Sequence, residues 1–301
     1  MKADVNDTII NYETSGTEGN PWITFSHALC NNLTLWDEQT EILKENFQIL
    51  RYDHRGLGKS AAVDLAKEGV NIAICSRNQE KIDLVKNEIE NISDVKVVAI
   101  QADLSLEKDI DTLFNKAKEE LKTIDILINN NGGPPPSTFE ELTDEDWQKA
   151  FNSTMMSAIR LSKLVLPDMK KNKWGRIINI SSVSVKTPVN GLFLSNSIRM
   201  GVLGWAKALS DEVAPHGITV NSVCPGTTKT ERIEQILNAQ SESSGKDMSE
   251  IEESMANSIP MLRIGEASDL SALITFLASE KASYMTGLAV QVDGGSARTF
   301  Y

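Results

Sequence analysis

Cysteine and histidine are scarce in this sequence, with three of each among 301 residues. The cysteines stand singly in apolar surroundings, which predicts reduced core thiols and argues against a disulfide framework or a cysteine-rich metal site. So few histidines leave little choice for the base of a catalytic triad. The six residues are Cys30, Cys75, Cys224, His27, His54 and His216. We therefore expect no metal site.

Positive charge is also in short supply. Lys and Arg number 30 against 42 Asp and Glu, which gives a formal net charge of −12 and a pI near 4.9. Such a surface repels nucleic acid and anionic membranes, so neither is expected as the main partner. The N-terminus has no apolar signal region, and no run approaches the roughly 18 apolar residues of a membrane span. We expect a soluble, cytoplasmic protein.

Two short patterns are informative, one by its absence. Gly-x-Ser-x-Gly, the strained turn that presents a nucleophilic serine, occurs nowhere in the chain. By contrast, residues 51–60 read RYDHRGLGKS, between a strand-like segment at 47–50 and a helix that opens at Ala61. Glycines at a helix start let backbone N–H groups approach a nucleotide phosphate. This turn is the first candidate for a cofactor site.

From residue 57 onward, apolar and β-branched segments alternate with amphipathic helical ones. This alternation predicts a parallel sheet covered by helices on both faces, that is, a doubly wound α/β fold of the Rossmann type. We expect strands at 70–75, 95–100, 125–129, 176–180, 218–223 and 288–292, and helices at 79–92, 106–121, 144–170 and 195–214. The polar, acidic stretch 231–257 interrupts the rhythm, either to cover a ligand or as a solvated excursion.

Residues 1–46 differ in character from the rest, which divides the chain into an N-terminal extension (1–46) and a nucleotide-binding domain (47–301). The extension contains FSHALCNN at 25–32 and Trp36, and the RYDHRGLGKS turn follows. These residues resemble the opening strands of α/β-hydrolases of the 3-oxoadipate enol-lactonase type. The resemblance covers about residues 1–60 and implies that His27 lies by an oxyanion hole. Without a nucleophile turn downstream, hydrolysis is disfavoured.

A second resemblance spans about residues 55–297. Six motifs follow in order: RGLGK at 55–59, ADL at 102–104, NNNG at 129–132, GRIINISS at 175–182, VNSVCPG at 220–226 with Thr230, and Gly287 with VDGG at 292–295. Together they resemble short-chain dehydrogenase/reductases, in particular 3-oxoacyl-[acyl-carrier-protein] reductases. The seam between the two resemblances falls at the turn itself, which suggests a chimeric N-terminus.

The second resemblance implies a cofactor site built from Arg55, Gly56, Leu57, Gly58, Arg77, Asp103, Asn129, Gly132, Pro225, Gly226 and Thr230. Arg77 stands where NAD-specific relatives carry an acidic residue. A guanidinium there can bind a ribose 2′-phosphate through paired hydrogen bonds, which favours NADP(H), with NAD(H) as the alternative. Tyr52 replaces the first glycine of the family's turn, and its side chain is expected to hinder close approach of a pyrophosphate.

The implied catalytic site departs from the family pattern of Asn, Ser and Tyr-x-x-x-Lys. Ser182 keeps the serine, Thr154 stands at the asparagine, and Ser195 and Arg199 occupy the tyrosine and lysine places. Hydride reduction of a carbonyl leaves an alkoxide that needs a proton. A serine hydroxyl is a much weaker acid than a phenol, and an arginine cannot usefully exchange its proton.

Three functions therefore stay open. The first is an NADP(H)-dependent reductase acting on an acyl thioester or other small carbonyl substrate. The second is a catalytically impaired protein that binds cofactor or forms oligomers, and the missing tyrosine favours it. The third, remote, is a hydrolase. The family resemblance also implies a homodimer or homotetramer formed through helices 144–170 and 195–214.

Overall fold

The computed structural model describes residues 57–230, 233, 237, 241 and 244–299, and the backbone of five short strands at 2–5, 8–11, 14–15, 22–26 and 48–52. Arg55, Gly56, Asp53 and His27 lie outside the described residues, and for Tyr52 and Leu57 only the backbone is described. Half of the expected phosphate turn is therefore not part of the description that follows.

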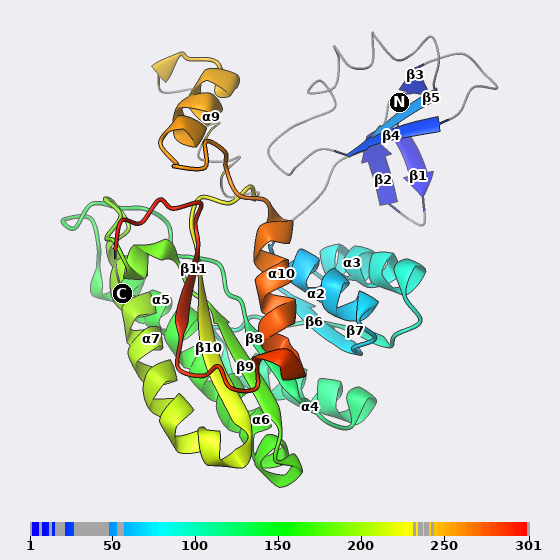
Figure 1. Cartoon of the computed structure of the whole chain (residues 1–301), viewed down its shortest axis with the longest axis vertical. Helices are drawn as coiled ribbons and strands as arrows, with labels where there is room; N and C mark the ends of the chain where they lie inside the picture. Colours follow the sequence, from blue (N-terminus) through cyan, green and yellow to red (C-terminus); the bar gives the residue numbers. More distant parts are fainter. Residues whose placement is uncertain are drawn as a thin grey trace.

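A four-stranded parallel sheet forms the centre of the molecule (Figure 1), in the order β11-β10-β9-β8. Its strands are β8 (Ile126–Asn129), β9 (Gly175–Ile180), β10 (Ile218–Pro225) and β11 (Ala289–Val292). Every residue of β9 is buried, as expected for a strand with neighbours on both edges and helices on both faces.

A second parallel ladder consists of β6 (Ile72–Ser76) and β7 (Val97–Gln101). Ile72 pairs with Val97, and the register continues to Ser76 and Gln101. No described strand pairs with the other edge of β6 or with the free edge of β8. The Rossmann-type strands are therefore present in two hydrogen-bonded pieces.

Helices cover both faces of these strands, which confirms the doubly wound architecture. One face carries α2 (Leu57–Lys67), α3 (Gln79–Ile92) and α10 (Ala267–Ala278), whose side chains share a core with Ile72, Val97, Ile178 and Val223. The other carries α4 (Glu107–Leu121), α6 (Ser157–Asn172) and α7 (Phe193–Val213). The first core joins both pieces of the sheet through apolar contacts.

The expected helix 144–170 contains a wide turn. It is built from α5 (Asp144–Ala150), a π-helical segment η2 (Phe151–Met156) and α6. Such π-helical turns are frequent at functional sites because they displace side chains from the regular helical spacing. Thr154 lies in this segment and is buried.

The N-terminal strands pair among themselves. β1 (Lys2–Val5) and β2 (Thr8–Asn11) are antiparallel, and β5 (Gln48–Tyr52) lies between β3 (Thr14–Ser15) and β4 (Trp22–Ser26). The sequence predicts a strand at 47–50 that enters the cofactor turn. A strand is found there, but it pairs with β3 and β4 and not with β6 or β8.

The polar stretch before α10 contains α9 (Met248–Asn257), beyond the carboxyl ends of β10 and β11 (Figure 1). Lys229, just after β10, joins it through an ion pair with Glu252 at 3.2 Å. Short turns η3 (Val183–Val185), η4 (Ala214–His216) and η5 (Glu280–Ala282) complete the described elements. Among the described residues, no helix is long and apolar enough to span a membrane.

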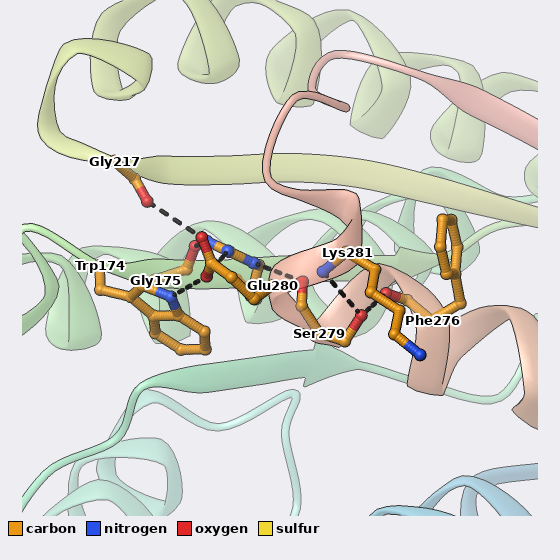
Figure 2. Close-up of polar contacts among 8 residues, drawn as sticks. Trp174, Gly175, Gly217, Phe276, Ser279, Glu280 and Lys281 are labelled. Carbon is orange, nitrogen blue, oxygen red and sulfur yellow. Dashed lines mark hydrogen bonds and ion pairs between the residues drawn. The ribbon is translucent and has the colours of Figure 1, made fainter.

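A polar cluster fixes the amino end of β9 (Figure 2). The buried Arg176 guanidinium donates hydrogen bonds to the carbonyls of Gly175 and Gly217. It also forms an ion pair with Glu280 at 3.0 Å and lies over the ring of Trp174. The Trp174 indole N–H donates to the same Glu280 carboxylate at 2.8 Å. This cluster joins β9 to η4 and η5 at the edge opposite the candidate site.

Candidate active and cofactor site

Four predicted residues follow the carboxyl ends of successive strands. Arg77 comes directly after β6, Asp103 after β7, Asn129 ends β8 and Ser182 follows β9. In doubly wound sheets this edge is the place where ligands bind, because the loops there leave a crevice. Strand pairing brings Arg77 near Asp103 and Asn129 near Ser182, and the apolar core that joins the two pieces of the sheet holds these two pairs together.

Asp103 is a charged group held in a turn. Its Oδ1 accepts hydrogen bonds from the Ser105 hydroxyl at 2.7 Å and the Ser105 amide at 2.9 Å. These bonds, with a smaller contribution from the charge of Arg77, lower the pKa of the Asp103 carboxyl. Arg77 itself is exposed. The two residues are near enough to interact and both can reach a ligand at this edge.

Asn129 and Asn179 pair across β8 and β9, with the Asn129 amide N–H donating to Asn179 Oδ1 at 2.9 Å. The remaining polar atoms of this pair, Asn129 Oδ1 and Asn179 Nδ2, are buried without a hydrogen-bond partner among the described residues. Buried polar atoms are rarely left unpaired. Beyond the strand, a Cβ on Gly132 would meet no atom within 4 Å, so the loop backbone there is open to a ligand.

Arg199 is the centre of the predicted catalytic group, and it is 7% exposed. Its guanidinium donates to the carbonyls of Ile180 at 2.7 Å, Ser181 at 3.1 Å and Asn131 at 3.2 Å. The side chain therefore holds the loop after β8 against the end of β9. It acts on the site's shape as well as on its charge.

Asn131 continues this network toward the π-helical segment. Its amide donates a hydrogen bond to the carbonyl of Ser153, the residue before Thr154. Thr154 Oγ1 is buried and has no partner among the described residues. Arg199, Asn129 and Thr154 line one cavity of about 830 Å³. Asn131 and Asn179 lie within two of the expected motifs but were not among the residues expected to form the site; the run of three asparagines at 129–131 was the available signal.

Ser182 lies at the start of η3, half-buried, where its oxygen accepts a hydrogen bond from the Ser184 amide at 3.1 Å. This bond leaves the hydroxyl proton free to be donated to a substrate oxygen. Ser195, in the first turn of α7, is buried. Neither Ser182 nor Ser195 is among the residues that line the cavity.

One of the residues predicted after β10, Gly226, also has a structural role. The Gly226 amide donates to the Val292 carbonyl at 3.0 Å, and a Cβ on Gly226 would lie 2.7 Å from Asp293 Cβ. Gly226 therefore permits close approach of the loops after β10 and β11. Pro225 is the last residue of β10, and Thr230 follows in the loop that leads toward α9.

The two described cysteines are not candidate nucleophiles. Burial raises the pKa of both the Cys75 and the Cys224 thiol to about 11. The thiolate is the nucleophilic form, so both side chains are neutral thiols at pH 7. The two described cysteines therefore supply no nucleophile at pH 7.

Comparison with known proteins gives a consistent result. A family model described as enoyl-(acyl carrier protein) reductase matches residues 52–297. The chain is 34% identical over 246 residues to the NADPH-dependent reductase BacG of Bacillus subtilis, covering 81% of this chain and 95% of that protein. It is 32% identical over 249 residues to the 3-oxoacyl-[acyl-carrier-protein] reductase FabG of Haemophilus influenzae, covering 80% and 93%.

Solved structures agree with these relatives. YwfH, described as an NADPH-dependent reductase involved in bacilysin biosynthesis, superposes with a TM-score of 0.77 at 34% identity, covering 82% of this chain and 96% of that one. L-sorbose reductase from Gluconobacter frateurii, solved with NADPH and L-sorbose, gives 0.79 at 27% identity, covering 82% and 94%. Both matches cover 82% of this chain.

Proposed function

Because the chain belongs to the short-chain dehydrogenase/reductase family, we propose that it is an NADP(H)-dependent oxidoreductase that interconverts a carbonyl and a hydroxyl group on an acyl thioester or other small substrate. The observation that carries this proposal is the convergence at the carboxyl edge of the sheet: Arg199 bonds Ile180, Ser181 and Asn131, with Thr154 and Asn129 beside it. The relatives named as NADPH-dependent reductases support the choice of cofactor.

The described residues fit a dinucleotide. Asn129 Oδ1 is a buried acceptor without a partner, Gly132 leaves space at the backbone, and Asp103 is an ionised acceptor beside Arg77. Asp103 and Asn129 would hold the adenosine part, Arg77 a 2′-phosphate, and Pro225, Gly226 and Thr230 would border the nicotinamide. Arg55, Gly56, Leu57 and Gly58 would meet the pyrophosphate. When bound, the cofactor supplies the hydride.

The protein's own groups would then handle the reacting oxygen. Ser182 has a hydroxyl proton available for donation, so it would hydrogen-bond the substrate carbonyl and the alkoxide that forms. Arg199 is a positioning residue that keeps the loop after β8 against β9. Ser195 would position a water molecule as the proton donor, because a serine hydroxyl is itself too weak an acid.

Nucleotide titration tests the cofactor. We expect saturable binding, with a higher affinity for NADPH than for NADH. Arg77→Glu should lower the affinity for NADPH by about tenfold or more and leave the affinity for NADH nearly unchanged. Lys171→Glu makes the same charge change at the exposed end of α6 and should alter neither affinity. Absence of binding of both nucleotides would refute the cofactor proposal.

A second candidate, a protein that binds cofactor without turnover, is favoured by one observation. The Arg199 guanidinium donates hydrogen bonds to backbone carbonyls, and position 195 holds a serine where the family pattern has a tyrosine. The double change Ser195→Tyr with Arg199→Lys should raise turnover of a 3-oxoacyl thioester if the substrate pocket is intact. Turnover that stays undetectable in this variant would favour the binding protein.

Three further properties are part of the proposal. The N-terminal segment derives from an α/β-hydrolase, which the pairing of β3, β4 and β5 among themselves supports.

The protein forms a homodimer or homotetramer through α5–α6 and α7. The exposed side chains of Phe193 and Met200 on α7 support this, and light scattering tests it. The free thiols Cys75 and Cys224 support a reducing, cytoplasmic setting.

A further inference from the structure

Acidic residues are missing from the three segments that contain the carboxyl ends of β8, β9 and β10. Residues 126–139, 175–210 and 217–230 have no Asp or Glu, although the chain contains 42 acidic residues and has a net charge of −12. The same segments carry Lys186, Arg199 and Lys229 close to these strand ends. The crevice there is therefore locally positive in an acidic protein, which favours an anionic ligand.

Two of these three cations already have partners. Arg199 donates to three backbone carbonyls, and Lys229 forms ion pairs with Glu252 at 3.2 Å and with Glu266 at 3.6 Å. The ammonium of Lys186 makes no hydrogen bond or ion pair with any described residue, although the side chain is half-buried. An ammonium has three donors, and those of Lys186 are therefore available to a ligand.

Lys186 ends η3, the short turn that begins directly after Ser182. In a 3₁₀ turn each residue advances by about 2 Å, so the Cα atoms of Ser182 and Lys186 lie within about 8 Å of each other. A lysine side chain has a flexible stem of four carbons. Its ammonium can therefore contact a molecule whose reacting oxygen is bound by Ser182.

The charge of Lys186 also acts at the end of β10. Burial raises the pKa of the Cys224 thiol, and the charge of Lys186 is the largest of the effects that lower it, with a smaller one from Arg199. Cys224 directly precedes Pro225, which is proposed to border the nicotinamide. The ammonium thus lies by the reacting end of the site, whereas Arg77, proposed for the 2′-phosphate, follows β6.

The strand geometry identifies the face of the sheet on which these groups meet. Val220 of β10 packs with Ala206 and Val213 of α7. Side chains alternate along a strand, so Cys224, four residues further, points to the same face. Arg199 belongs to α7 as well. The two cations near the Cys224 thiol therefore lie on the face that α7 covers.

One carboxylate does lie close to this end of the sheet, but it has partners of its own. A Cβ on Gly226 would lie 2.7 Å from Asp293 Cβ. The Asp293 carboxylate accepts hydrogen bonds from the amides of Gly295 at 3.0 Å and Ala297 at 2.8 Å. It stabilises the turn after β11 and makes no ion pair with Lys186.

We propose that Lys186 binds a carboxylate of the substrate, and that the substrate is a 2-oxo or 3-oxo acid. In such a molecule at most one carbon atom separates the carbonyl from the carboxylate, which suits the short distance between Ser182 and Lys186. A charge-assisted hydrogen bond to the ammonium would orient the carbonyl at Ser182. The inference rests on the proposed function, because it takes Ser182 to bind the reacting oxygen.

A neutral substrate would leave the charge of Lys186 without a partner. The carbonyl of an acyl thioester or of a simple ketone has no anionic neighbour, so the bound molecule would exclude water from the ammonium and offer nothing in exchange. Removing an unpaired charge from water is unfavourable. An oxo acid supplies the missing counter-ion.

Calorimetric titration of the full chain, with and without NADP⁺, tests the inference by binding alone. The probes are 2-oxobutanoate, acetoacetate and the methyl ester of each, since the ester keeps the carbonyl and removes the charge. We expect at least one of the two acids to bind about tenfold or more tightly than its ester.

Three variants assign this preference to Lys186. Lys186→Met should lower the affinity for the preferred acid by about tenfold or more and leave that for the ester within about twofold. Lys186→Arg keeps the charge and should retain most of the affinity for the acid. Lys171→Met removes an exposed lysine at the end of α6 and should change neither affinity.

Steady-state kinetics give a second readout. The ammonium contacts the carboxylate both before and during the reaction, so Lys186→Met should raise KM for the acid by about tenfold or more and change kcat by less than about threefold.

Equal affinities for acid and ester, or no measurable binding of either acid, would overturn the inference on the unmodified chain alone. An affinity for the acid that Lys186→Met leaves unchanged would do the same. A loss of NADPH affinity in Lys186→Met would assign the ammonium to the cofactor and also overturn it. The proposed function is tested separately, by titration of the unmodified chain with NADPH, so the two failures are distinguishable.

Discussion

At the scale of single residues, Arg199 holds two segments of the candidate site together. A guanidinium offers five donors in a planar fork, and here three hydrogen bonds reach carbonyls on two different loops. An ammonium in the same place has a single nitrogen and cannot span both loops in the same way. The residue therefore contributes to the stability of the edge on which the site is built.

This reasoning predicts the effect of Arg199→Met. Three carbonyl oxygens, two of them in buried hydrogen bonds, lose the donor that Arg199 supplies, so the free energy of unfolding should fall by about 2–4 kcal/mol, measured by urea unfolding. Arg160→Met breaks only a partly exposed ion pair with Glu107 and should cost less than about 1 kcal/mol. Equal losses in the two variants would contradict the structural role given to Arg199.

At the scale of single elements, α10 is defined by a reciprocal cap. Asp269 accepts from the Glu266 amide at 2.8 Å and pairs with Arg263 through two hydrogen bonds, of 2.6 and 3.0 Å. The hydrogen bonds from Arg263 are the main reason why the pKa of the Asp269 carboxyl is lowered, and the amide bond adds to it. α10 packs on α2 and on both pieces of the sheet, so its cap supports the core.

The lowered pKa sets the sign of a pH effect. The folded state favours the ionised carboxyl, so its contribution is present above the unfolded pKa of about 3.9 and is lost as pH falls through the folded value. Asp269→Asn should cost about 1 kcal/mol at pH 7, and the difference from the unmodified chain should shrink below about pH 4. Unfolding curves between pH 3 and 7 measure this. A difference that does not depend on pH would contradict it.

Elements were predictable from sequence wherever local pattern and tertiary setting agree. The helix 79–92 is found at the expected bounds, and all six expected strands are present with shifts of one or two residues. In each of these segments the spacing of the apolar residues fits either a helix or a buried strand, and not both. The family followed from motifs at strand ends, and the position of the site at the carboxyl ends of the strands stays a prediction.

Other features depend on interactions that no local pattern records. Helical spacing around Thr154 was expected to be regular, yet the chain forms the π-helical segment η2. The strand at 48–52 was recognisable as a strand, but its partners were not, since both β4 and the pair β6 and β8 offer it parallel edges. The hydrogen bonds of Arg199 to carbonyls also depend on the folded geometry.

At the scale of the whole molecule, the two ends of the parallel strands have separate roles. The carboxyl ends hold the candidate site, and the amino end of β9 is fixed by the Arg176 cluster (Figure 2). The Arg176 side chain is fully buried, and burial lowers the pKa of its guanidinium, while Glu280 remains largely exposed. Stability and ligand binding should therefore respond independently to changes there.

We predict that Arg176→Met lowers the free energy of unfolding by about 2–4 kcal/mol, because the carbonyls of Gly175, Gly217 and Ser279 lose a buried donor. Glu280→Gln keeps an acceptor for Arg176 and should cost less than about 1 kcal/mol. Nucleotide affinity, measured by titration at a temperature where both variants are folded, should match that of the unmodified chain. A large affinity loss in Arg176→Met would show that the two edges are coupled.

The division of the sheet also bears on cooperativity. No described strand pairing joins the β6–β7 ladder to the β8–β11 ladder, so the two are held together by side-chain packing and helices alone. The strands of one hydrogen-bonded ladder tend to unfold together as a unit. Apolar packing is not directional, so two ladders joined only by packing can unfold separately. We therefore expect β6, β7 and α3 to unfold before the rest, in a distinct first transition. A single cooperative transition would contradict this expectation.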